Sequence, residues 1–400
     1  MVGERKYDII VFGCTGFTGL LTAEYLAKTA PKRGLTFAIA GRNEEKLKEV
    51  QLKLGNPAID YVIADSFDQE SLNTMTSLCS AVITTVGPYM KYGEPLVRAC
   101  VENGTHYTDL TGEYPFMYDI ISKYHDQARA KGVKIVHCCG YDCIPVDMCT
   151  FLASKGLSSS PSIVRGLCTS SCGLASGGTL DSGKGMFKWS QAPENKSLAQ
   201  DPYLLVPNID DELRVDREWT TKYGVGYDTR FGTVTLPYFM SMIDNRVVRR
   251  SIALRKEAAS FDEAMSFGAV GQATGFLLRH LPSVFASGLR PKAGDGPNAT
   301  IRNSGYFSFE VRAEGTGGDV CTAYVTGSGD PGYKATSVML AEAAMCLVTD
   351  FDSDESANEE DLDHFKGGVL TPSTAMGEVL IKRLEQTGDF KFTVTRPSAL

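Results

Sequence analysis

Residues 7–19 read YDIIVFGCTGFTG, and this stretch decides the fold. An apolar, largely β-branched run passes into a turn with three glycines spaced three residues apart, and the amphipathic segment 20–28 follows. A strand, a glycine turn and a helix in this order are typical of a dinucleotide-binding fold. The glycines permit a tight turn, close approach of a pyrophosphate and close packing of the helix on the strand, and the helix start offers unpaired N–H groups. Because the spacing is G-x-x-G-x-x-G, the prediction depends on the flanking strand and helix. A glycine turn without a ligand is the alternative.

The first 140 residues alternate predicted strands and helices. Helical runs cover 44–54 and 115–131. Strands are predicted at 7–13, 36–41, 60–65, 81–86, 106–110 and 133–138. Repeated βα units predict an α/β fold, with a doubly wound parallel sheet of the Rossmann type and right-handed crossovers. Ligands of such sheets bind beyond the carboxyl ends of the strands, so the chemistry is expected there.

The pattern changes after about residue 150. Strand-like stretches follow at 161–169 and 305–329, and the second is predicted to be a β-hairpin that turns at residues 315–318. An antiparallel or mixed sheet in a second domain fits these stretches. Helices are predicted at 335–348 and 373–386, an acidic loop at 350–363 and a last strand at 390–395.

The composition indicates a soluble globular protein. Of the 400 residues, 43% are hydrophobic and 22% charged, and the formal net charge of −8 argues against nucleic acid as a partner. The eleven cysteines lack a disulfide-framework pattern, and the first strand begins by residue 7. A reducing, cytoplasmic location is therefore expected. No run reaches 18 uninterrupted apolar residues, and the apolar stretch 264–289 is predicted to be a buried or interfacial helix.

The end of the second predicted strand favours NADP(H) over NAD(H). An acidic residue there would bind the ribose 2′-OH, whereas this chain has Arg42 and Asn43 after a glycine. A guanidinium can pair with a 2′-phosphate and stack on adenine. Asp65, at the end of the third strand, is a candidate for the adenine amino group, with capping of the next helix as the alternative.

Several longer runs resemble one family, the saccharopine dehydrogenase-like oxidoreductases, in the branch of the trans-acting enoyl reductases. The most specific is VGPYMKYGEPLVRACVENGTHYTDLTGE at 86–113. The others are GCTGFTG at 13–19, AGRN at 40–43, CCGYDCIPVD at 138–147 and GDPGYKATSVMLAEAAMCL at 329–347. The resemblance covers nearly the whole chain. It implies an NADP-binding Rossmann domain at 1–150, an α+β substrate-binding and dimerisation domain at 151–332, and a segment at 333–400 that returns to the Rossmann domain.

Polar residues at the strand ends are the candidates for chemistry. Tyr89, after Gly87 and Pro88, could donate a proton to the atom that gains charge after hydride delivery, with aromatic packing as the alternative. Asp109 follows the fifth strand and, if buried, needs a partner such as a bound substrate or the N-terminus of the next helix. Glu113 nearby is expected to cap that next helix.

The run that follows the sixth strand adds three candidates. Asp142 could orient the nicotinamide amide or a polar group of the substrate, with turn stabilisation as the alternative. Tyr141 is a second candidate proton donor, and Cys143 is expected to pack rather than to act as a nucleophile. Scattered histidines and the absence of C-x-x-C pairs argue against a metal site.

The predicted site thus has a catalytic and a cofactor-binding part. Its catalytic residues are Tyr89, Asp109, Tyr141 and Asp142. Its cofactor-binding residues are Gly13, Thr15, Gly16, Phe17, Thr18, Gly19, Arg42, Asn43, Asp65, Gly87 and Pro88.

The predicted function is an NADPH-dependent reductase that delivers hydride to a C=C or C=N bond of a largely apolar small molecule. A nucleotide-binding scaffold or sensor without turnover is one alternative. Genuine saccharopine-type C–N oxidoreduction, which would need a cluster of arginines, is another. A homodimer is expected, together with peripheral contact of the 264–289 stretch with lipid, an organelle or a lipid droplet.

Overall fold

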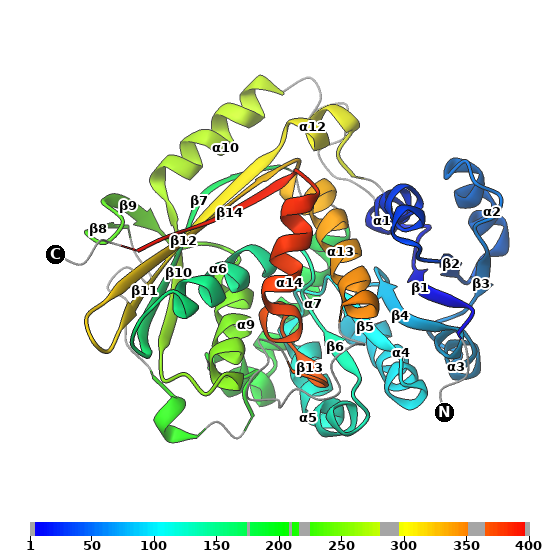
Figure 1. Cartoon of the computed structure of the whole chain (residues 1–400), viewed down its shortest axis with the longest axis horizontal. Helices are drawn as coiled ribbons and strands as arrows, with labels where there is room; N and C mark the ends of the chain where they lie inside the picture. The colour runs from blue at the N-terminus through cyan, green and yellow to red at the C-terminus, as the bar shows by residue number, and fades with distance from the viewer. Residues whose placement is uncertain are drawn as a thin grey trace.

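The computed structural model describes residues 5–173, 177–207, 210–215, 225–280, 296–350 and 365–396. It contains two sheets side by side, with helices packed around and between them (Figure 1). The predicted acidic loop at 350–363 lies outside these residues except for Asp350, and so does 281–289 of the predicted apolar helix.

The first sheet is entirely parallel. Its strands, in spatial order, are β13 (Gly368–Leu370), β6 (Lys134–Val136), β5 (His106–Asp109), β4 (Cys79–Thr84), β1 (Tyr7–Phe12), β2 (Phe37–Gly41) and β3 (Tyr61–Ile63). Its helices are α1 (Phe17–Thr29), α2 (Glu44–Lys53), α3 (Gln69–Ser77), α4 (Tyr89–Asn103), α5 (Tyr114–Ala130), α13 (Thr336–Thr349) and α14 (Pro372–Gln386). This is the doubly wound arrangement that the alternation of elements predicted.

Strand β1 shows why the sheet is covered on both faces. Ile9 and Val11 belong to one hydrophobic cluster, with residues of α1 and α13, whereas Ile10 and Phe12 belong to another, with residues of α3, α4 and α5. Successive side chains of a strand point to opposite faces. A continuous apolar strand therefore needs a helical layer on each side, which is what a parallel sheet provides.

The second sheet is mixed. Its order is β14 (Phe390–Thr395), β12 (Val320–Ser328), β11 (Tyr306–Gly315), β7 (Pro161–Cys172), β10 (Ser260–Ser266), β9 (Thr233–Leu236) and β8 (Gly226–Asp228). Only the β7–β10 pair is parallel. The accompanying helices are α6 (Ile144–Lys155), α7 (Gly177–Gln191), α8 (Lys196–Gln200), α9 (Ser241–Leu254), α10 (Phe267–Arg279) and α12 (Ala299–Ser304).

The chain returns to the first sheet after the second one is built. Residues Pro331–Ala335 form a π-helical turn, and α13 then packs on β1, β4 and β5. The last segment contributes β13 to the first sheet and β14 to the second, so both sheets end on a strand from the C-terminal part (red in Figure 1). One hydrophobic cluster runs from the α1 and α13 layer through α6 to β7, β11 and β12.

The predicted fold class is confirmed: a Rossmann-type sheet is followed by a second α and β region and a C-terminal return. The predicted domain boundaries at 150 and 332 stay predictions; one falls within α6 and the other within the π turn. The predicted apolar helix begins later than expected, because residues 264–266 end strand β10. No helix among the described residues is long and apolar enough to cross a membrane. All eleven cysteines are buried and unpaired.

Candidate functional site

The glycine turn is shaped to leave a space at the start of α1. Gly13 has a φ of +94°, and a Cβ there would lie 2.7 Å from Val86 Cγ2. A Cβ on Gly19 would lie 2.4 Å from the Gly13 carbonyl oxygen. At Gly16, by contrast, the nearest atom to a Cβ would be 3.4 Å away. Within the described chain, no side chain caps α1 and its first turn carries no acidic residue. The turn therefore fits a diphosphate, which would be held by backbone N–H groups.

Two segments from later in the chain close around this turn. The Phe17 ring packs edge-on against Tyr333, with ring centroids 5.2 Å apart. The guanidinium of Arg302 lies 5.4 Å from the Phe17 ring centroid. The predicted cofactor residue Phe17 thus links the turn to α12 and the π turn, whereas Thr15 is exposed and Thr18 half-buried.

The adenosine end of the predicted site lies where β2 and β3 end. Arg42 is exposed there. The Asn43 side chain accepts a hydrogen bond from the Lys46 N–H at 2.9 Å and caps α2. Asp65 accepts from the Phe67 N–H at 3.0 Å. The side chain that caps α3 is that of Asp68, so Asp65 does not fill the predicted capping role. The sequence reasoning missed Phe67, whose ring is 68% exposed at this same end of the sheet.

Tyr89 is held by packing. It is buried, and its hydroxyl donates to the Thr84 carbonyl at 3.1 Å. Its ring lies 5.9 Å from that of Phe116, and burial raises the pKa of the hydroxyl well above its ordinary value. These contacts favour the packing interpretation of Tyr89. Gly87 and Pro88 precede it in the loop between β4 and α4.

Asp109 is fully buried and ties the ends of β5 and β6 together. One carboxylate oxygen accepts from the backbone N–H groups of Thr111 and Cys138, both at 3.1 Å. The other accepts from the Tyr107 hydroxyl at 2.9 Å and lies 2.7 Å from His137 Nδ1. With four partners, this carboxylate is better suited to holding the strand ends in place than to proton transfer.

Glu113 caps a helix, but not the helix that follows it. Its carboxylate accepts from the backbone N–H groups of Tyr89 (3.0 Å) and Met90 (2.8 Å), at the start of α4. Ser182 of α7 donates to the same group at 2.7 Å. Glu113 therefore joins α4 to the second region of the molecule.

Tyr141 and Asp142 lie in the loop between β6 and α6. The Tyr141 hydroxyl is 3.0 Å from that of Tyr238, and its backbone N–H donates to Thr336 Oγ1 at 3.0 Å. Asp142 is half-buried, and among the described residues no hydrogen-bond donor reaches its carboxyl group. Burial raises its pKa to about 6, which suits a group that must exchange a proton near neutral pH.

Two further carboxyl groups lie behind Asp142, and the sequence reasoning missed both. Asp244 is in the first turn of α9 and fully buried; its Oδ1 accepts from Cys143 Sγ at 3.2 Å. Glu263 lies within β10 and is 5% exposed. Asp142, Asp244 and Glu263 are called the carboxyl cluster below. No local pattern joins residues this far apart in the sequence, and a glutamate within a strand is usually solvent-facing.

The arginines of α9 donate to backbone carbonyl groups. Arg246 donates to the carbonyls of Met242 and Ala199, Arg249 to that of Phe261 and Arg250 to those of Leu205 and Val369. Three cations in α9 thus bind backbone oxygens.

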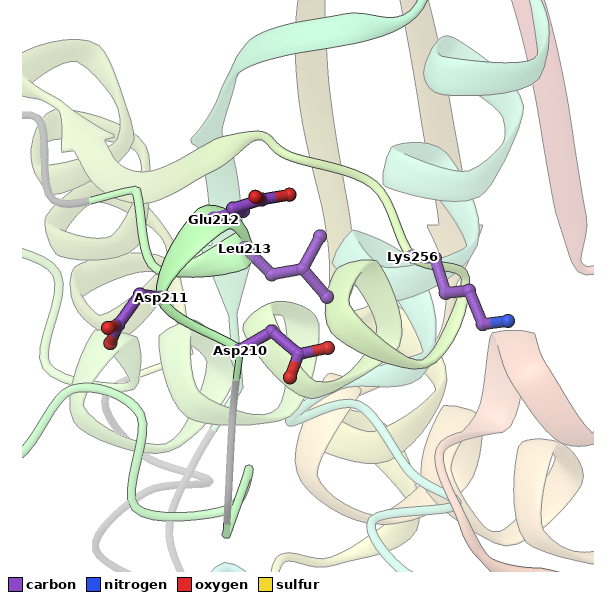
Figure 2. Close-up of a pocket in the computed structure, with 5 residues that line it drawn as sticks. All are labelled: Asp210, Asp211, Glu212, Leu213 and Lys256. Carbon is purple, nitrogen blue, oxygen red and sulfur yellow. The ribbon is translucent and has the colours of Figure 1, made fainter.

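A separate surface hollow of about 540 Å³ contains none of the predicted site residues. It is lined by Asp210, Asp211, Glu212, Leu213 and Lys256. Figure 2 shows Asp211 and Lys256 pointing away from each other, so the lining does not converge on one point. The strand ends of the first sheet remain the better candidate.

Comparison with known proteins gives consistent results. The family described as "Saccharopine dehydrogenase NADP binding domain" matches residues 9–136. A relative from Mycobacterium tuberculosis, named for enoyl reductase activity, is 35% identical over 419 residues, with 96% of each chain covered. The trans-acting enoyl reductase of Mycobacterium leprae is 32% identical and covers 96% of this chain and 97% of its own.

A solved structure shares the fold. The saccharopine dehydrogenase (L-Glu forming) of Saccharomyces cerevisiae superposes with a TM-score of 0.52 at 12% identity, over 97% of this chain and 100% of that one.

Proposed function

The chain belongs to the saccharopine dehydrogenase-like oxidoreductases, in the branch of the trans-acting enoyl reductases, and from this premise we propose that it reduces the C=C bond of an enoyl substrate. It is an NADP-dependent reductase, and NADP(H) is its cofactor. The substrate is a largely apolar small molecule in which the double bond is conjugated to a carbonyl group.

One observation carries the proposal: a partly accessible, protonatable carboxyl group lies at the same strand-end edge as the glycine turn. Asp142 follows β6, and the turn at Gly13 follows β1. Bound NADPH supplies a hydride. The chain's own task is then to supply a proton, and a carboxyl group whose pKa is raised to about 6 can do so near neutral pH.

An imine is the second candidate substrate, and the carboxyl cluster favours it specifically. A protonated imine carries a positive charge, and unpaired carboxyl groups would attract it. Saccharopine-type chemistry has less support, because a substrate with several carboxylates needs cations, and the arginines of α9 donate to backbone carbonyls.

The first experiment measures cofactor affinity by calorimetry for wild type and Arg42→Ala. We expect NADPH to bind more tightly than NADH, and the variant to lose roughly 10-fold or more in NADPH affinity, because a charge-assisted hydrogen bond contributes about 1.5–3 kcal/mol. Lys53→Ala is the matched control, since it removes an exposed cation at the far end of α2. An unchanged preference in Arg42→Ala would remove Arg42 from the site.

The second experiment follows NADPH oxidation with 2-enoyl thioesters and with cyclic imines. Wild type should oxidise NADPH with the thioesters, and Asp142→Asn should be slower by roughly 100-fold or more while still binding NADPH. Asp119→Asn, an exposed position in α5, should match wild type. Oxidation with imines alone would favour the second candidate. No oxidation with either class would contradict the proposal and favour a scaffold or sensor.

A further inference from the structure

Two buried carboxyl groups lie on α9 and β10, which pack against each other. Asp244 is 0% exposed and Glu263 is 5% exposed. Among the described residues, no donor reaches Asp244 Oδ2 or either carboxyl oxygen of Glu263. The two carboxyl groups nevertheless act on each other.

A proton shared by the two groups would avoid the burial of two adjacent, unpaired charges. Two adjacent carboxylates can only accept, so both would remain buried, charged and unpaired, which is strongly unfavourable. If one group is protonated, it donates to the other, and oxygens of both then have a partner. Burial raises the pKa of both carboxyl groups above their ordinary values, in agreement with a retained proton.

Among the residues that the structure describes, no cation acts on the pair. Arg165 of β7 is aligned with Asp262, whereas Glu263 is aligned with Gly166. Successive strand side chains point to opposite faces, so Arg165 and Glu263 lie on different faces of the sheet. A Cβ on Gly166 would lie only 3.1 Å from Glu263 Cβ.

The groups that face the pair are acids or neutral donors. The segment before α9 contributes Tyr238, β7 contributes Cys168, and the loop after β6 contributes Asp142 and Cys143. Asp262 of β10 adds a further acid beside Glu263. Cys143 Sγ donates to Asp244 Oδ1 at 3.2 Å and precedes the first residue of α6, directly after Asp142. The charge of Asp142 also acts on Asp244.

We propose that Asp244 and Glu263 share one proton and serve as positioning residues that keep Asp142 supplied with the proton used in reduction. The inference rests on the proposed function for its catalytic part, whereas the shared proton does not depend on that function. It assigns a role to two residues that contact neither the glycine turn nor the predicted cofactor residues.

The reaction balances when the Asp244–Glu263 pair supplies a proton to Asp142. The substrate β-carbon gains the hydride supplied by NADPH, and the C=C electron pair moves towards the carbonyl oxygen. The α-carbon then takes a proton from the Asp142 carboxyl group, which completes the new C–H bond. The Asp142 carboxylate regains a proton from the Asp244–Glu263 pair, and the pair regains one from water after the product leaves. The sum is substrate, NADPH and H⁺ to reduced product and NADP⁺.

The shared proton is tested by infrared spectroscopy of the protein without substrate. At pH 7, where exposed carboxyl groups are ionised, wild type should still show a protonated-carboxyl C=O band. Glu263→Gln and Asp244→Asn should each lose or shift this band, and Asp262→Asn should keep it. Asp262 is a suitable control because it is buried in the same strand but accepts from the Asn245 side chain at 2.7 Å. If the wild-type band is absent at pH 7, the inference is wrong, whatever the enzyme reduces.

The catalytic part is tested by the pH profile of kcat. In wild type, the rate should fall at alkaline pH as the pair loses its proton. In Glu263→Gln, Asp244 loses a neighbouring acid, so this fall should move to lower pH by about one unit or more, with the KM for NADPH unchanged. If the infrared band is present in wild type but the pH profile of kcat is not shifted in Glu263→Gln, the pair does not supply the proton. A purely structural defect would lower kcat at every pH.

Discussion

The three glycines of the first turn are needed for different physical reasons. Gly13 adopts a positive φ that side chains disfavour. Gly19 lies so close to the Gly13 carbonyl that no Cβ fits. Gly16 has an ordinary extended conformation and nearby space, so its hydrogen side chain serves the ligand rather than the fold.

This difference predicts opposite results for two alanine substitutions. Gly16→Ala should fold with nearly unchanged unfolding free energy but should bind NADPH at least roughly tenfold more weakly, because its methyl group occupies the space of the diphosphate. Gly19→Ala should lower the unfolding free energy by about 3 kcal/mol, since overpacking against backbone is costly. Urea unfolding and calorimetry on both variants check this. Equal loss of stability in the two would contradict the assignment.

A second residue-scale prediction concerns pH. Burial raises the pKa of the Asp244–Glu263 pair, so in a window that starts near the ordinary carboxyl pKa the folded state binds more protons than the unfolded state. Stability then decreases as the pH rises through this window. Glu263→Gln should gain stability relative to wild type between pH 5 and 8, by at most about 1.4 kcal/mol per pH unit. Thermal melts across this range test the sign. Asp262→Asn should show no such trend.

Residue types at the strand ends were predictable, but their partners were not. Asp109, Glu113 and Asp142 were identified because polar residues after parallel strands lie at one edge. Whether each is saturated by hydrogen bonds depends on residues up to 70 positions away, such as Ser182 for Glu113. Asp244 and Glu263 had no local pattern at all, since α9 and β10 meet the β6 loop only in the folded chain.

At the scale of elements, the N-terminus of α4 is capped by a carboxylate from a residue that lies outside this helix. Glu113 accepts from the first two N–H groups of this helix, and Ser182 of α7 donates to it. A carboxylate at a helix N-terminus is favoured both by the hydrogen bonds and by the helix dipole. The contact therefore couples the start of one helix to a second element.

Glu113→Gln should weaken this junction. An amide cannot accept as strongly from two N–H groups, so we expect the unfolding free energy to drop by about 1.5–3 kcal/mol. Ser182→Ala, which removes only one neutral donor, should cost about 1 kcal/mol. Urea unfolding measures both values, and Glu102→Gln, exposed near the end of the same helix, serves as the control. A similar loss in all three variants would argue against a specific cap.

The elements themselves were predicted unevenly, for a physical reason. The βα repeats and the hairpin of β11 and β12 have strong local periodicity, and their predicted bounds agree with the structure to within a few residues. Strands β8, β9 and β13 span only three or four residues each, and their pairing depends on the sheet that they join. Helix α9 contains five polar residues on buried positions, including Arg249 and Arg250, which masks its amphipathic pattern.

At the scale of the whole molecule, the C-terminal segment completes both sheets. Strand β13 pairs with β6 in the first sheet, and β14 pairs with β12 in the second. Between them, α14 packs against α13 and α6. Removal of this segment exposes a strand edge in each sheet together with part of the common core.

Truncation should therefore affect the entire protein. A chain ending at residue 364 should be insoluble or lack a cooperative melt, because two strand edges and the α13 surface become exposed. A chain ending at Arg396 should melt like wild type, since β14 ends at Thr395. Circular dichroism of both truncations checks this. A folded, cooperative short form would mean that the two sheets are stable without their shared segment.

The eleven buried thiols can be used to measure local opening of the native structure. A thiol must be both exposed and ionised to react with an alkylating reagent, and here burial removes the first condition and disfavours the second. Labelling therefore proceeds only during transient excursions from the native state, at a rate set by how often each region opens. Because the cysteines are spread over β4, α4, α6, β7, β12, α13 and the loops after β1 and β6, site-resolved labelling would record which parts of the molecule open together.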